Sequence, residues 1–125
     1  MGLRICSVDD AIGKLRKRFE GRADELLIGL FLDRDFKVHG DFAVQGARDI
    51  VSMPLAEFAA KAAGSGAVYL ALAHNHPSGD PTPSRGDGEA TAATVRACET
   101  LGIRMLDHLI FATGGVTSMR ALGII

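Results

Sequence analysis

The feature that most constrains this chain is a pair of histidines, His74 and His76, directly after an apolar run. The run, residues 67–73, is short and rich in strand-forming residues, as expected for a buried strand. Side chains two residues apart on a strand point to the same face, so both imidazoles can reach one point. The sequence therefore predicts a strand that ends in a chelating histidine pair.

The segment after the histidines leads to an acidic residue. Prolines and glycine in residues 77–83 exclude regular structure until Ser84, where a helical pattern begins. Asp87 lies three residues further and can turn back toward the histidines. Two histidines and one carboxylate, with a fourth position left for water, are typical of catalytic rather than structural zinc. Ser84 would then stand beside the metal.

Ser84 and Asp87 also fit a purely structural pattern. S-x-x-D is a variant of the capping box, in which Ser84 accepts a free helical N–H and Asp87 favours the positive helix end. An isolated H-x-H is equally weak evidence for a metal. The combination favours the metal site, because a rigid loop between a strand-end histidine pair and an acidic helix start has no purpose in plain packing.

The stretch from His74 to Asp87 matches the signature H-x-H, seven residues, S-x-x-D of the JAMM metalloproteases, also called JAB or MPN. The sequence A-H-N-H-P-S-G-D-P-T-P-S at residues 73–84 resembles the RadC branch of that family. So does L-D-H-L-I at residues 106–110. The resemblance implies one α/β domain of the JAMM/MPN type, similar to the cytidine deaminase arrangement, with a mixed β-sheet flanked by helices.

The resemblance also implies a site and a reaction. It implies Zn²⁺ bound by His74, His76 and Asp87, and a catalytic glutamate at the start of an early strand, which corresponds to Glu25 followed by L-F-L-D. Glu25 would act as general base and Ser84 would stabilise the oxyanion while zinc-bound water hydrolyses a peptide or isopeptide bond. From the residues alone, Glu25 is either a solvated carboxylate at a strand end or one held near a positive group, and the first is favoured.

Composition bounds the alternatives. The 125 residues form one expected domain, residues 1–125, and 47% of them are hydrophobic, enough for a core. Lys and Arg number 14 against 15 acidic residues, so direct nucleic-acid binding and a nuclease are not expected. The basic segment 14–18 is interpreted as a solvated helix face. An inactive metal-binding or interaction module associated with DNA repair, as the RadC name suggests, stays open.

The remaining expectations concern setting and partners. Two cysteines outside any C-x-x-C pattern favour a reducing cytoplasm, and no apolar run reaches the roughly 20 residues that span a bilayer. We expect a peptide or protein substrate, and a homodimer is compatible with the sequence. Longer RadC-like proteins carry an N-terminal helical region that resembles DNA-binding modules. The sequence lacks that region, so it is either a short member or an excised domain.

The predicted order is helix, strand hairpin, helix, strand, helix, strand, strand. Helices are predicted after Ser7, after Ser52 and Pro54, and over 84–101, and strands over 25–33, 37–44, 67–73, 103–111 and 116–119. The last helix should bury Thr91, Thr94, Val95, Cys98 and Leu101. Asp107 and His108 are neighbours on a strand and cannot both face one metal, so one is predicted to form hydrogen bonds that support either a metal ligand or the fold.

Overall fold

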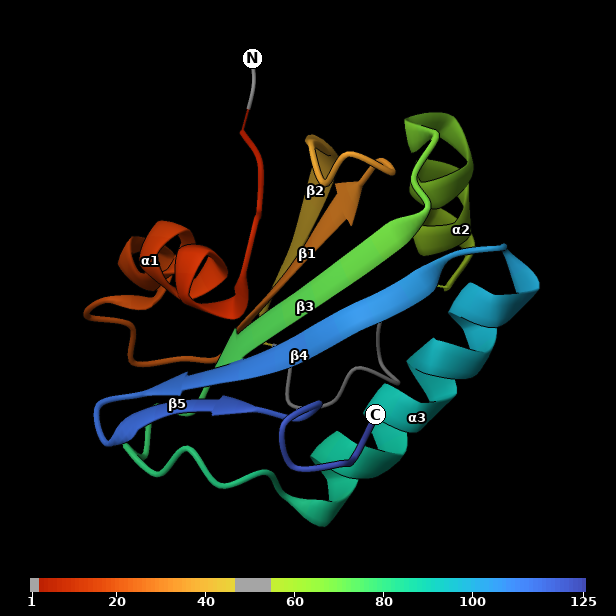
Figure 1. Cartoon of the computed structure of the whole chain (residues 1–125). Coiled ribbons are helices and arrows are strands. Elements are labelled where there is room, and N and C mark those ends of the chain that lie inside the picture. Colours follow the sequence, from red (N-terminus) through yellow and green to blue (C-terminus); the bar gives the residue numbers. More distant parts are fainter. Residues whose placement is uncertain (1–2, 47–54) are drawn as a thin grey trace.

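The computed structural model describes residues 3–46 and 55–125, and its core is a five-stranded mixed sheet with helices on both faces (Figure 1). The strand order is β2-β1-β3-β4-β5. β1 pairs antiparallel with β2 on one side and with β3 on the other, β3 and β4 pair parallel, and β4 and β5 pair antiparallel. The predicted α/β class with a mixed sheet is confirmed. The predicted helix start at Ser52 and Pro54 lies outside the described residues.

The first helix, α1 (Val8–Phe19), covers one face of the sheet. The Ser7 side chain accepts the N–H of Asp10, which caps the first turn as the sequence predicts. Leu15 is buried although charged residues surround it, so the basic segment is a solvated helix face. The helix packs with β1, β3 and β4 residues that include Leu26, Ala73 and Phe111.

The other face is covered by α2 (Leu55–Ser65) and α3 (Arg85–Thr100). Phe58 of α2 and Cys98 of α3 pack on Leu27, Leu70 and Leu72 of the sheet. Leu101 was predicted on the buried side of α3, and this is wrong. It is the C-cap residue and 40% exposed, because the chain leaves the helix there.

The central strands are buried and the outer strands are not. β1 (Leu26–Leu32) is buried at every residue, whereas β2 (Val38–Gln45) buries only Phe42. β3 (Tyr69–Asn75) and β4 (Arg104–Ala112) are joined by α3, as parallel neighbours require. β5 (Gly115–Ser118) forms the opposite edge. This order places the end of β3, with its histidines, in the middle of the sheet.

Candidate metal centre

The three residues predicted to bind metal converge where β3 ends and α3 begins. Nε2 of His74 lies 3.1 Å from Nε2 of His76, which lies 3.1 Å from Oδ2 of Asp87. Nε2 of His74 lies 3.5 Å from Oδ1 of Asp87. Among residues 3–46 and 55–125, no other group of three or more His, Cys, Asp or Glu side chains lies close enough to hold a metal ion.

These separations fit a tetrahedral ion. Bonds of about 2.0–2.2 Å at tetrahedral angles place two ligand atoms about 3.3–3.6 Å apart. The His74–His76 and His76–Asp87 separations, both 3.1 Å, are near that range, and the 3.5 Å separation joins His74 to the other carboxylate oxygen of Asp87. Two imidazole nitrogens and one carboxylate oxygen accept several divalent ions, zinc among them. The side chains present therefore fit a metal with one coordination position left over.

Asp87 serves the helix and the cluster at once. Ser84 Oγ accepts the N–H of Asp87 over 3.0 Å, and Asp87 Oδ2 accepts the N–H of Ser84 over 2.8 Å, which completes a capping box. Burial raises the pKa of Asp87, but hydrogen bonds from His74 and Ser84 outweigh it and hold the pKa below its usual range. The carboxylate is therefore ionised, as a metal ligand must be.

A chain of hydrogen bonds behind the cluster sets the tautomer of His74. The Thr91 hydroxyl donates to the Asp87 carbonyl over 2.7 Å, so its oxygen accepts the Nδ1 proton of His108 over 2.8 Å. Burial and the nearby charge of His74 lower the pKa of His108 to about 3, so its ring is neutral at pH 7. Nε2 of His108 therefore accepts from Nδ1 of His74 over 2.7 Å. Nδ1 thus keeps its proton, so when Nε2 gives up the proton that it shares with Asp87, the lone pair of His74 is on Nε2, toward the cluster.

Of the pair Asp107 and His108, only His108 contacts one of the three clustered residues, namely His74. Asp107 accepts the Ser118 hydroxyl over 2.5 Å and the backbone N–H of Arg120 over 3.1 Å. These bonds hold β4 to the end of β5, so Asp107 stabilises this edge of the sheet. His108 is fully buried and supports the cluster through His74, as predicted for one member of the pair.

Glu25 directly precedes β1 and is not one of the three clustered residues. Leu27 pairs with His74, so the same antiparallel register puts Glu25 opposite His76. Residues two apart share a face, and Leu27 faces the α3 side of the sheet. Alternation continued from Leu27 would direct the Glu25 side chain toward the face from which the cluster is built.

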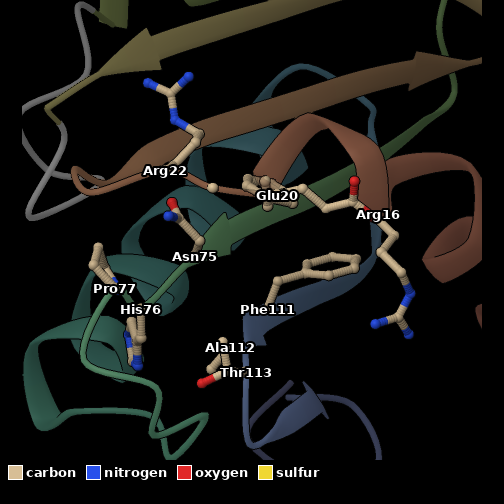
Figure 2. A pocket seen from close by; sticks show the side chains of 11 residues that line it. Arg16, Glu20, Arg22, Asn75, His76, Pro77, Phe111, Ala112 and Thr113 are labelled. Carbon is tan, nitrogen blue, oxygen red and sulfur yellow. The ribbon is translucent and has the colours of Figure 1, made fainter.

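A pocket of about 330 Å³ lies beside His76 (Figure 2). Its walls come from the last turn of α1 and from the ends of β3 and β4. Phe19 and Phe111 stack in its wall, with ring centroids 4.7 Å apart. Arg16 and Thr113 also line it. Of the three clustered residues only His76 lines this pocket, and Phe19 and Phe111 belong to the α1 side of the sheet.

Two supporting residues, Thr91 and Asn75, were not predicted to support the cluster. Thr91 was predicted only as a buried helix residue, although its position four residues after Asp87 places both on one helix face. Asn75 was not singled out, and nothing in the sequence except its place between the histidines distinguishes it. Their contacts are between separate elements, which a single sequence does not display.

Comparison with known proteins agrees with this geometry. The family described as RadC-like JAB domain matches residues 5–124. The UPF0758 protein of Ruegeria pomeroyi is 41% identical over 95% of this chain and 54% of its own length. That of Carboxydothermus hydrogenoformans is 33% identical over 95% of this chain and 53% of its own length.

A further UPF0758 protein, from Aquifex aeolicus, is 34% identical over 98% of this chain and 53% of its own length. The chain thus spans about half the length of these relatives. No helix among the described residues is long and apolar enough to cross a membrane. The family match covers nearly the whole chain, and the fold is the mixed α/β arrangement of a JAB/MPN domain. This chain belongs to the RadC family of JAB domain proteins.

Proposed function

We propose that this domain is a zinc-dependent hydrolase of amide bonds in peptides or proteins. The observation that carries the proposal is the convergence of His74, His76 and Asp87 at separations near those of a tetrahedral site. No fourth His, Cys, Asp or Glu of the described residues joins them. A structural zinc is normally closed by a fourth protein ligand, whereas a catalytic zinc keeps a position for water.

The mechanism assigns one task to each remaining residue. Zinc held by the three ligands would polarise the substrate carbonyl and lower the pKa of water toward about 7. Glu25 takes a proton from the attacking water and returns it to the leaving amine, a role worth about 10²- to 10⁴-fold in rate. Ser84 Oγ accepts the Asp87 N–H, so its own proton is free to donate to the developing oxyanion.

The pocket beside His76 supports a polymeric substrate. Its volume of about 330 Å³ exceeds what an attacking water needs, and it opens between α1 and the strand ends. A peptide side chain next to the scissile bond would fit there, which favours a peptide or isopeptide over a small amide.

The first test is metal content, measured by plasma mass spectrometry on untagged protein prepared without chelator. We expect about one zinc per chain in the parent and a loss in His76→Ala. The matched control is His39→Ala, because His39 is an exposed β2 residue that pairs with Asp33 far from the cluster. Absence of zinc in the parent, even after reconstitution, would overturn the hydrolase.

The second test is turnover of peptide and isopeptide libraries by the zinc-loaded domain and by the longer protein that contains it. Glu25→Gln should keep its zinc and lose activity about 10²- to 10⁴-fold. Full activity in Glu25→Gln would refute the assignment of the base. A parent that binds zinc but cleaves no library member would instead point to a metal-binding interaction module.

A further inference from the structure

Asn75 lies between the two ligand histidines, but its side chain faces the other side of the sheet. Figure 2 shows its amide and the His76 ring pointing away from each other. The residue is 4% exposed. Its Oδ1 accepts the N–H of Leu26 over 2.7 Å, and its Nδ2 donates to the carbonyl of Asp24 over 3.0 Å. One side chain therefore holds the backbone on both sides of Glu25.

The Asn75 side chain takes the place of backbone hydrogen bonds that β3 does not form with residues 24–26. The β1–β3 ladder ends at the pair Leu27 and His74, so no backbone pair holds residues 24–26 to β3. The Asn75 amide supplies the donor and the acceptor that a continuing strand would offer. On the opposite edge, the N–H of Gly46 donates to the Glu25 carbonyl over 2.7 Å. The backbone at Glu25 is thus fixed from both neighbouring strands.

We propose that Asn75 is a positioning residue that sets the place of Glu25 relative to the histidine pair. This inference rests on the proposed function. Its chemistry needs a short side chain with both a donor and an acceptor, which asparagine has, while aspartate lacks the donor and alanine lacks both. A catalytic group displaced by about 1 Å can lose about 10²-fold in rate. Asn75→Ala should therefore lose about 10- to 100-fold in turnover and keep its metal.

The decisive experiment needs no substrate. The metal-free domain is loaded with cobalt(II), whose visible bands respond to the ligands and to the hydrogen bonds around them. Parent, Asn75→Ala, Glu25→Gln and the double variant are compared, with Thr94→Val as control. Thr94 also makes a buried hydrogen bond, to the Ala90 carbonyl within α3, but has no contact with residues 24–26. Amide exchange at Leu26 is measured in the same proteins.

Asn75→Ala should bind one cobalt per chain and shift the visible cobalt bands as Glu25→Gln does. The double variant should show no shift beyond that of either single variant. Exchange at Leu26 should rise in Asn75→Ala and stay at the parent rate in Glu25→Gln and Thr94→Val. Parent bands in Asn75→Ala, or additive shifts in the double variant, would overturn the positioning role alone. A parent that binds no cobalt would overturn the proposed function and this role with it.

Circular dichroism identifies a variant that fails to fold. In that case Asn75→Asp takes the place of Asn75→Ala, because it has the same shape and keeps the acceptor for Leu26. It sets a carboxylate oxygen against the Asp24 carbonyl, so it should produce the same band shift while Leu26 stays protected. Parent bands in Asn75→Asp would also contradict the proposal.

Discussion

Nδ1 of His74 donates to Nε2 of His108 over 2.7 Å, and this bond reaches from β3 to the parallel strand beside it. A ring nitrogen can bind a metal only if its lone pair is free, and the partner of the other nitrogen decides which one that is. The neutral, buried His108 would therefore orient His74 for a metal without being one of the three clustered residues.

The first prediction concerns this bond. His108→Phe keeps an aromatic ring but removes the acceptor, so we expect metal affinity to fall about 10- to 100-fold. Competition with a fluorescent chelator measures the affinity, and His39→Ala serves as the control because that histidine is exposed on β2. Equal affinities of parent and His108→Phe would show that the hydrogen bond does not tune the site.

The second prediction separates the two tasks of Ser84. Ser84→Ala removes the N-cap acceptor of α3, so the free energy of unfolding should fall by about 1 kcal/mol. Loss of the hydroxyl donor should also lower turnover, by about 10²- to 10³-fold. Ser7→Ala removes the matching cap of α1 and should cost similar stability but leave turnover intact. Turnover lost equally in both variants would assign Ser84 to the cap alone.

The third prediction concerns Gly29, which pairs with Phe42 across β1 and β2. A Cβ at Gly29 would lie 2.1 Å from Cε1 of Phe42, so Gly29→Ala should destabilise the domain by about 1–3 kcal/mol. Gly88→Ala is the contrasting variant, because its Cβ in α3 would meet no atom within 4 Å. Gly88→Ala should raise the free energy of unfolding by about 0.5–1 kcal/mol. Urea unfolding of both variants checks the signs.

The fourth prediction concerns the thiols. Cys98 is fully buried, and burial followed by the nearby charge of Glu99 raises its pKa to about 11. Cys6 is exposed. A disulfide reagent at pH 8 should therefore label Cys6 at once and Cys98 only on unfolding. Rapid labelling of both thiols in the native protein would contradict the buried position of Cys98.

The same shift gives a pH dependence. The unfolded thiol ionises near pH 9 and the folded one near 11, so the unfolded state holds fewer protons between these values. Stability should fall as pH rises through this window, by at most about 1.4 kcal/mol per pH unit. The free energy of unfolding should fall more steeply with pH in the parent than in Cys98→Ala within this window, whatever their absolute stabilities. Unfolding titrations at a series of pH values measure both slopes.

The local parts of the fold and site could be predicted from the sequence. His74 and His76 lie two apart on one strand, and Ser84 and Asp87 three apart at a helix start, so each pair is fixed by the geometry of its own element. Turn residues and apolar runs likewise placed the strands within a few residues. The prediction that Leu101 is buried was wrong because helical periodicity continues in the sequence past the point where the helix ends.

The meeting of the histidine pair with Asp87 was predicted, but the contacts behind the cluster could not be. His108 reaches His74 only through the β3–β4 register, which shifts between Leu70 and Ala71. Asn75 holds Asp24 and Leu26 only because the β1–β3 ladder stops at His74. Both facts depend on where strands distant in sequence align, and no spacing within one segment encodes that.

Asp87 belongs both to the first turn of α3 and to the cluster at the end of β3. An ion bound there would connect the two ends of the crossover that leaves β3 and enters α3. Ligand binding to the folded state alone adds RT ln(1 + [L]/Kd) to stability, about 2.7 kcal/mol at a hundredfold excess over Kd. Removal of the ion by a chelator would withdraw that contribution and leave the capping box of Ser84 and Asp87 to hold the start of α3 by itself.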